Sequence, residues 1–506
     1  MKASPYPQIG VEVREFAPHP LGPPPCHLSG RGGERRLLFG VWRLGTLPPQ
    51  PLPLARREGG AFPGTLWSMI ERYCTPAMTA IFSREAKAQR WLDVELAICQ
   101  AYAEAGVIPA EDLRIIQEKA AFDLMRCDEI EQVTRHDLMA FVRNVSENIS
   151  GIDALSPELE TQKNGGPSRW VHFGVTSYDV IDTALGMMLR DGCQALMDSA
   201  QLLDHEILRL AKANVDTVCI GRTHGIHAEP VTFGQKLAGW HEELQRSISR
   251  LEDCKSEIAV GKVSGAVGIR AHASPAIEKR VCDILGLSPD PISTQIISRD
   301  RHAHVLSVLA VLAGSLERFA TELRNLQRTE ILEVQEEFAA GQTGSSAMPH
   351  KRNPWNSETV CGLARLVRGN AHAMLESIMT WHERDLSNSS LERVIFPDTF
   401  QLCDFMLHRL TRILKGLVVM PENMAKNVRL MGDLVFSEHV MVALIRAGFS
   451  REAAYKVAQR NAAKAWEGQD FRTSVSSDPD VCEKLSPEEI NGLFDMQHHL
   501  TNAWRG

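Results

Sequence analysis

The stretch FGQKLAGWHEELQRSISRL, residues 233–251, decides the fold class of this chain. Its apolar residues follow one another from Phe233 to Leu251 at intervals of 4, 3, 4, 4 and 3. Intervals of three and four place side chains on one face of an α-helix. Segment 302–335 keeps this rhythm from Val305 to Leu326 and contains no proline, which predicts a single helix on the order of 50 Å long.

Other segments show the same helical periodicity, whereas the alternation typical of strands is nearly absent. Helices with such long apolar stripes need partners to cover them. We therefore expect an all-α fold with a long central helical bundle, and an oligomer in which the stripes continue into neighbouring subunits. The further helical segments are 85–106, 194–213 and 355–379, and polar, glycine-rich breaks lie at 150–169, 214–232 and 286–301.

The first 68 residues differ from the rest of the chain. They hold 12 of the 26 prolines and 10 of the 36 glycines, with 8 Lys/Arg against 4 Asp/Glu and no periodicity. This composition predicts a disordered leader, and Met69 is the natural start if 1–68 is translated upstream sequence. The prolines and glutamates argue against the alternative of an organelle transit peptide. The remainder is expected to divide into an N-terminal helical domain (69–193), the central bundle (194–447) and a smaller C-terminal helical domain (448–506).

Composition excludes several classes of protein. Hydrophobic residues make up 44% and charged residues 23% of the chain, as in ordinary soluble proteins, and the net charge of -8 argues against a general nucleic-acid binder. The 11 cysteines are scattered without a C-x-x-C pair, which indicates a reducing compartment and no disulfide framework. The most apolar run, 304–314, is shorter than the roughly 20 residues that span a bilayer. We therefore expect a cytoplasmic protein that binds neither nucleic acid nor membrane.

Residues 344–354, GSSAMPHKRNP, interrupt the helical pattern. The two prolines remove backbone donors and push the residues before them out of the helical conformation. Two serines beside His350, Lys351 and Arg352 indicate a mobile loop that holds an anion.

Further polar clusters lie at the other breaks. Each of their histidines has an ordinary structural explanation when taken alone: His224 as a capping group, His136 in a surface ion pair and His172 in the core. Taken together, the clusters favour a functional site. They are TRHDLMAFVR (134–143), VHFGVTSYDVIDTA (171–184), GRTHGIHAEPVTFG (221–234) and HERDLSNSSLERV (382–394).

Two of these clusters are suited to anions. Thr176 and Ser177 are expected to be N-caps of a helix that begins near Asp179, where free N–H groups bind carboxylate or phosphate. Arg384 and Arg393 flank a serine pair, an arrangement that can grip a phosphate or a carboxylate. Motifs for nucleoside triphosphates, dinucleotides, zinc proteases and serine hydrolases are absent from the sequence, and the histidines lack metal-ligand spacing.

An elimination from a substrate with a succinyl group on nitrogen would use these parts. A base removes the proton next to a carboxylate, fixed cations stabilise the resulting dianion, and an acid protonates the departing nitrogen. A closing loop can activate a serine as this base through Lys351 and backbone amides while it excludes water. In this hypothesis Lys351 and Asn353 hold the carboxylates.

These motifs resemble a known family. GSSAMPHKRNP is similar to the signature loop of the fumarase/aspartase superfamily, and its MPHKRNP form resembles the adenylosuccinate lyase family. The resemblance covers about 69–506 and includes MIERYCTPAM, GKVSGAVG, PISTQ and RDRHA. It implies a three-domain helical subunit in a homotetramer, with each active site built from three subunits. It also implies fumarate release from adenylosuccinate, giving AMP, and from succinylaminoimidazole carboxamide ribotide, giving AICAR, in purine biosynthesis, without metal or organic cofactor.

The resemblance also implies roles for individual residues. His224 would be the general acid, oriented by Glu358, and Ser345 the base, with Ser346 the less favoured choice; His172 would assist His224 or grip the phosphate. The nucleotide phosphate is expected to contact Arg72, Tyr73, Ser389 and Arg393, the succinyl carboxylates to contact Thr176, Ser177, Lys351 and Asn353, and further substrate contacts to come from Arg135, His136, Asp137, Gln295 and Arg384.

Two features depart from the family pattern, and two alternatives compete with it. The leader 1–68 could obstruct the pocket, and the loop 150–169 is long enough to alter subunit packing. Another enzyme of the superfamily, such as argininosuccinate lyase or fumarase, is disfavoured by His350 and Arg352. A catalytically silent scaffold would lack Ser345, His224 or Lys351, and all of these are present.

Overall fold

A computed structural model describes residues 71–506, apart from 162, 339–340 and 342–343. The leader predicted over 1–68 and the predicted start at Met69 lie outside the described residues, as do residues 342–343 of the signature loop predicted over 341–354. The described part is predominantly helical, and its few strands are short. The prediction of an all-α fold is confirmed.

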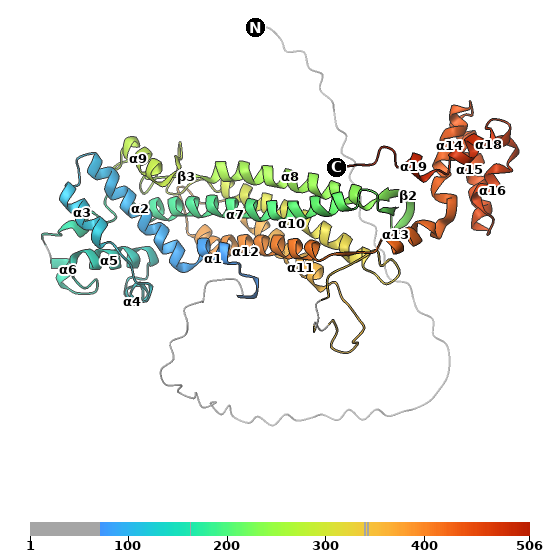
Figure 1. The fold of residues 1–506 in the computed structure, drawn as a ribbon. Helices are drawn as coiled ribbons and strands as arrows, with labels where there is room; N and C mark the ends of the chain where they lie inside the picture. The colour runs from blue at the N-terminus through green and yellow to red at the C-terminus, as the bar shows by residue number, and fades with distance from the viewer. Residues whose placement is uncertain (1–70, 162, 339–340, 342–343) are drawn as a thin grey trace, which may run out of the picture. The chain divides into compact units, whose positions relative to one another are not determined.

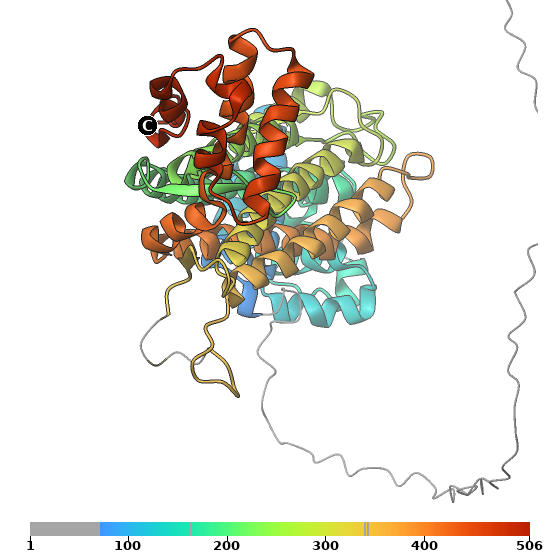
Figure 2. The ribbon, with the colours of Figure 1, turned by 90° about the vertical axis from the view of Figure 1, so that its right-hand side faces the viewer.

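Long helices form a central bundle with one shared core (Figures 1 and 2). The stripe of the opening stretch faces this core: Trp240 is buried and stacks on Phe319, with ring centroids 4.8 Å apart. The bundle helices are α7 (Ser177–Ala213), α8 (Phe233–Ile258), α10 (Arg299–Leu326), α11 (Trp355–Glu376) and α12 (Ser387–Lys415).

Helix α10 is shorter than the helix predicted over 302–335. After Leu326 the chain turns back, and the buried amide of Gln327 holds the turn by accepting from Glu336 N at 2.9 Å and donating to Arg352 O at 3.1 Å. Two residues of the predicted helix form strand β5 (Val334–Gln335) instead, paired with β6 (Val418–Val419). By length and composition α10 could cross a membrane, but 61% of its most apolar window is buried inside the protein.

The N-terminal region has a second core, which includes the first part of α7 and the helix α9 (Pro275–Leu285). Short strands β3 (Val260–Gly261) and β4 (Ser288–Pro289) pair beside it. The remaining elements of this region are η1 (Glu71–Tyr73), α1 (Pro76–Phe82), α2 (Arg84–Glu104), α3 (Ala110–Lys119), α4 (Leu124–Thr134), α5 (Asp137–Ser150), α6 (Glu158–Thr161) and η2 (Pro167–Trp170).

The break predicted at 214–232 contains an antiparallel hairpin, β1 (Val218–Thr223) and β2 (Ile226–Thr232). Ile220 of this hairpin packs in a third core with the C-terminal helices, which explains why the strands form at all. Those helices are α13 (Pro421–Val428), η3 (Arg429–Phe436), α14 (Ser437–Arg446), α15 (Arg451–Trp466), α16 (Phe471–Ser476), α17 (Pro479–Cys482), α18 (Pro487–Gly492) and α19 (Met496–His499).

The three cores do not follow the predicted domain limits residue by residue. Helix α7 runs unbroken across the limit placed at 193/194, and the third core already includes Val428 and Leu444. The division into three domains stays a prediction.

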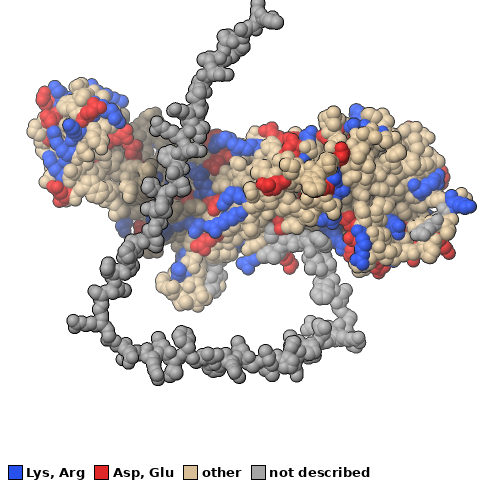
Figure 3. Space-filling model, turned by 180° about the vertical axis from the view of Figure 1, so that it is seen from behind, with Lys and Arg blue, Asp and Glu red and all other residues tan. Residues whose placement is uncertain are grey.

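On the face in Figure 3, basic and acidic side chains are interspersed. The net charge of the whole chain is -8.

Candidate active site

The predicted site residues lie mainly at two ends of the bundle. One group, the α7-start set, surrounds the first turn of α7. The other, the hairpin set, lies on the β1–β2 turn, the loop 344–354 and the first turn of α11, toward the other end of the bundle (Figure 1). Helix α7 has 37 residues, which corresponds to roughly 55 Å. The α7-start set comprises Arg135, His136, Asp137, His172, Thr176, Ser177, Gln295, Arg384, Ser389 and Arg393, and the hairpin set comprises His224, Ser345, Ser346, Lys351, Asn353 and Glu358.

The start of α7 organises the first set. Thr176 is the N-cap, as predicted, and its N–H donates to the Asp179 carboxylate at 2.8 Å, while Ser177 is the first helical residue. The Ser177 hydroxyl lies 3.4 Å from His136 Nε2. The Ser177 hydroxyl thus faces the loop that carries the RHD sequence at the N-terminus of a helix, an arrangement suited to a carboxylate.

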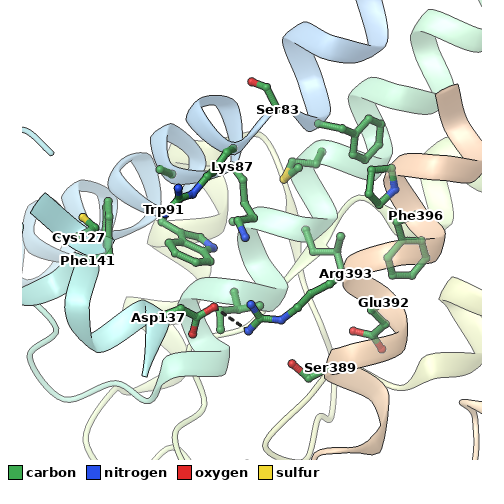
Figure 4. A pocket seen from close by; sticks show the side chains of 18 of the residues that line it. Ser83, Lys87, Trp91, Cys127, Asp137, Phe141, Ser389, Glu392, Arg393 and Phe396 are labelled. Atoms are coloured by element: carbon green, nitrogen blue, oxygen red, sulfur yellow. Dashed lines mark ion pairs between the residues drawn. The ribbon is translucent and has the colours of Figure 1, made fainter. Parts of the chain in front are cut away.

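Two arginines join this set from the segment before α12 and from α12 itself. Arg393 pairs with Asp137 at 2.6 Å, the ion pair drawn in Figure 4. Arg384 donates to the Gln295 side chain at 3.0 Å, and its guanidinium lies 3.5 Å from the centre of the Tyr178 ring. Chain segments far apart in sequence therefore converge here with two guanidiniums.

His172 belongs to this set and has an unusual backbone. Its φ is +64°, and two other predicted site residues, Arg135 and His224, also have positive φ, each at +54°. Non-glycine residues in this region are strained, and such strain gathers at functional sites. The ring Nδ1 of His172 lies 2.7 Å from Glu95. Burial lowers the pKa of His172, but the hydrogen bond and charge of Glu95 outweigh it, so that the pKa is raised.

Glu95 was missed by the sequence analysis. It sits in the apolar run of α2 and is 2% exposed. Its other oxygen accepts from the His172 N–H at 2.9 Å, so one carboxylate fixes both ring and backbone of that residue. A single acidic residue on a buried helical face was the only signal in the sequence.

A cavity of about 280 Å³ adjoins this set between α2, α5, α7 and α12 (Figure 4). Trp91 and Phe396 give it apolar walls, and Lys87, Asp137 and Arg393 supply charge. Burial, together with the positive charge of Arg393, lowers the pKa of Lys87 to about 8. Lys87 was also missed, because lysine on an amphipathic helix ordinarily points to solvent.

A buried ionic cluster connects the helices that carry residues of the α7-start set. Arg299 at the start of α10 binds Asp182 of α7 through two hydrogen bonds of 2.8 and 2.9 Å and Glu392 of α12 through bonds of 2.7 and 3.0 Å. The Arg299 and Asp182 side chains are fully buried. The cluster thus ties together the helices that carry Ser177 and Arg393.

The hairpin set begins with His224, which occupies the turn between β1 and β2 beside Gly225 at φ +78°. His224 is exposed. The neighbouring Arg222 binds the buried Glu333 at 2.6 and 3.2 Å, and Asn427 donates to the same carboxylate at 2.8 Å. The base of the turn is therefore anchored by Arg222 and Glu333, whereas His224 at its tip is exposed.

The signature loop closes on itself. Asn353 donates from its amide to Gly344 O at 3.0 Å, and the Ser345 hydroxyl oxygen accepts from the N–H groups of Ala347 and Met348 at 3.3 and 3.1 Å. These two donors would stabilise negative charge on that oxygen. Ser346 and Lys351 are exposed.

Several predicted partners are not joined within one chain. Among the described residues no hydrogen bond links Glu358 with His224, although both lie at the same end. Arg72 and Tyr73 lie along the bundle: Tyr73 packs on Phe405 at 5.1 Å, the ring that also contacts Arg409. Within the described ranges no group of His, Cys, Asp or Glu is arranged to hold a metal ion.

Comparison with known proteins places this geometry in a family. A lyase family model matches residues 71–369, and a model of the adenylosuccinate lyase C-terminus matches 433–505. The adenylosuccinate lyase of Synechocystis sp. is 50% identical over 86% of this chain and 98% of its own length. The chain belongs to the adenylosuccinate lyase family. The family member of Bacillus subtilis is 47% identical over 86% of this chain and 98% of its own length.

Solved structures agree with the superfamily fold of the chain. A 3-carboxy-cis,cis-muconate lactonizing enzyme from Pseudomonas putida is 30% identical, with a TM-score of 0.74 over 85% of this chain and 94% of its own. A fumarate lyase from Mesorhizobium sp. BNC1 is 26% identical, with a TM-score of 0.73 over 84% and 94%. As a member of this family, the chain is a lyase.

Proposed function

We propose that the chain is an adenylosuccinate lyase that releases fumarate from adenylosuccinate, leaving AMP, and from succinylaminoimidazole carboxamide ribotide, leaving AICAR. Membership of the family over nearly the whole length of its relatives carries this proposal. Purine biosynthesis in the cytoplasm is the corresponding role.

The reaction breaks a carbon–nitrogen bond without redox change. Ser345 Oγ takes a proton from the succinyl carbon next to a carboxylate, and His224 gives a proton to the departing nitrogen. The electron pair of the C–H bond becomes the double bond of fumarate. Lys351, Thr176 and Ser177 hold the carboxylates, where charge accumulates in the transition state.

The arginines of the α7-start set are the proposed ligands of the substrate phosphate. Arg393 and Arg384 would bind the phosphate, with Ser389 beside them, and the raised pKa of His172 favours its cationic form near this anion. Asp137 would then exchange its ion pair with Arg393 for a looser contact.

The two sets require more than one copy of the chain. A single α7 separates Ser177 from the hairpin by roughly 55 Å, whereas the substrate spans about one nucleotide. The bundle helices also expose Leu202 of α7, Val311 of α10 and Leu366 of α11, as helices that pack against other subunits do. We therefore propose a homotetramer whose active sites combine the α7-start set of one subunit with the hairpin set of others.

The first experiment offers adenylosuccinate and argininosuccinate separately to the purified protein and follows fumarate. Release from adenylosuccinate alone supports the proposal, and release from argininosuccinate alone overturns it. Ser345→Ala and His224→Ala should each lower kcat by about 10²–10⁴-fold while the oligomer stays intact. A near-normal rate in either variant would refute that residue's role.

Mixing two inactive variants tests the shared site. Arg393→Ala removes part of the α7-start set and His224→Ala part of the hairpin set. If each site draws these residues from different subunits, random mixed tetramers regain about a quarter of the active sites. Subunits that carry complete sites of their own would regain none.

A further inference from the structure

Two histidines outside the predicted site are in direct contact at the C-terminal end of the chain. His439 of α14 and His499 of α19 place their Nε2 and Nδ1 atoms 3.0 Å apart. The other nitrogen of each ring meets a carbonyl oxygen: His439 Nδ1 lies 2.9 Å from Leu493 O, and His499 Nε2 lies 2.9 Å from Pro230 O.

This arrangement fixes the number of protons. A carbonyl oxygen only accepts, so His439 Nδ1 and His499 Nε2 must each carry a hydrogen. With both rings neutral, two lone pairs would then face each other at 3.0 Å. One more proton between the rings turns this repulsion into an N–H···N hydrogen bond. The contact therefore requires three protons on four nitrogens, and the pair carries one positive charge.

The surroundings suit such a charge. Phe436 packs against both rings, with centroids 5.5 Å from His439 and 6.0 Å from His499. Glu229 of β2 and Glu438 of α14 share a hydrogen bond beside the pair, and burial together with the charge of Glu438 raises the pKa of Glu229. The pair lines a second cavity, whose other charged and titratable groups are Arg446, Lys484, Glu489, Asp495 and His498.

The pair holds the strand that leads from His224. Pro230 lies on β2 opposite Ile220 of β1, and His224 occupies the turn between these strands (Figure 1). We propose that His439 and His499 are positioning residues, which through one shared proton fasten β2 to the C-terminal helices and so place His224 for catalysis. This inference rests on the role proposed for His224.

The sign of the pH dependence follows from the proton count. The fastened pair holds one proton more than two neutral rings and one fewer than two cationic rings. Where histidine is mostly neutral, the fastened state is therefore lost as the pH rises. Loss of the shared proton leaves a half-buried nitrogen facing another lone pair, a penalty that changes an equilibrium by roughly tenfold.

Two substitutions of His439 separate a shared proton from simple packing. In His439→Gln the side-chain amide donates to His499 Nδ1 without an extra proton. In His439→Leu no donor remains. His498→Gln is the matched control, because His498 is the exposed neighbour of His499 in the chain.

The variants are compared from about pH 7 to about pH 9, above the ordinary pKa of histidine, where the separated rings are mostly neutral. Fumarate release is measured on each, together with hydrogen exchange of the amides in 218–232, expressed relative to the exchange rate of an unprotected amide at the same pH. We expect the wild type and His498→Gln to lose kcat and gain exchange as the pH rises, and His439→Gln to change less. His439→Leu should be roughly tenfold lower in kcat even at the low end.

Superimposable rate and exchange profiles for the wild type and both His439 variants would overturn the inference. Equal pH dependence in the wild type and His439→Gln would also overturn it, because packing alone would then explain the contact. If the wild type releases no fumarate but exchange responds as expected, the proposed function fails while the fastening by a shared proton stands.

Discussion

Arg299→Met should be among the most damaging single substitutions in this chain. Arg299 is fully buried and makes bonds of 2.7–3.0 Å to Asp182 and Glu392, which come from two other helices of the bundle. Methionine fills much of the same volume but leaves both carboxylates buried without a cation. Removing one partner of a buried ion pair costs about 3–5 kcal/mol, a large part of the 5–15 kcal/mol that usually stabilises a folded protein.

Urea unfolding measures this cost. The matched control is Arg368→Met, because Arg368 also pairs with a glutamate, at 2.6 Å, but its side chain is 42% exposed and the pair is worth about 0–1 kcal/mol. The midpoint of Arg299→Met should lie well below that of Arg368→Met. Replacing Asp182 and Glu392 by leucine in the Arg299→Met background should restore part of the loss, because no unpaired charge remains.

The effect also has a defined pH dependence. Burial alone would raise the pKa of Asp182, but Arg299 outweighs it and holds the pKa below its usual value. This stabilisation is present above the unfolded pKa of about 3.9 and is lost as the pH falls through the folded value. The difference between wild type and Arg299→Met should therefore shrink toward pH 3. Midpoints of Arg299→Met and Arg368→Met that coincide at pH 7 would refute the reasoning.

Three further substitutions probe the site. Glu95→Gln should lower the pKa of His172, measured by NMR titration of the ring, because the carboxylate that raises it is gone; an unchanged titration would contradict the geometry. The pKa of Lys87 is lowered to about 8, so the KM of the wild type for an anionic substrate should rise as the pH passes this value. Lys87→Met should have a high KM that does not rise further at that pH. Gly344→Ala would place its Cβ in steric conflict with Lys351 O, which prevents the observed loop conformation. Turnover should fall about 10²-fold with an unchanged urea midpoint, and a normal rate would show that this conformation is dispensable.

Periodicity predicted the long helices because their apolar stripes face a core that the same helices build. The segment 233–251 becomes α8, and Thr176 caps α7 as its residue type indicated. The predicted end of α10 was wrong. The helix ends where Gln327 binds Glu336 and Arg352, and these partners come after a chain reversal that no local sequence pattern reveals.

The polar motifs supplied the candidate site residues, but the partners of these residues are distant in the sequence. Glu95 meets His172 across 77 positions, and Arg299 meets Asp182 across 117. Apart from its place in the apolar run of α2, nothing near Glu95 in the sequence distinguishes it from a glutamate on a solvated face. The hairpin at 214–232 escaped detection for a related reason, since its strands are stabilised by Ile220 packing on helices more than two hundred residues later.

The length of the central helices is part of the proposed site. Because α7 carries Ser177 at one end and leads to the hairpin of His224 at the other, one inserted helical turn would shift one set against the other by about 5.4 Å. The loop 150–169, by contrast, leaves α5 after Ser150 and returns before His172, where Trp170 donates to Asp112 at 2.8 Å. Among its residues whose burial is described only Ala154 is buried, and its ends are fixed by contacts within the N-terminal region. Added sequence at this place changes the surface without changing the distance between the two sets, which is why the long loop is compatible with the motifs on either side of it.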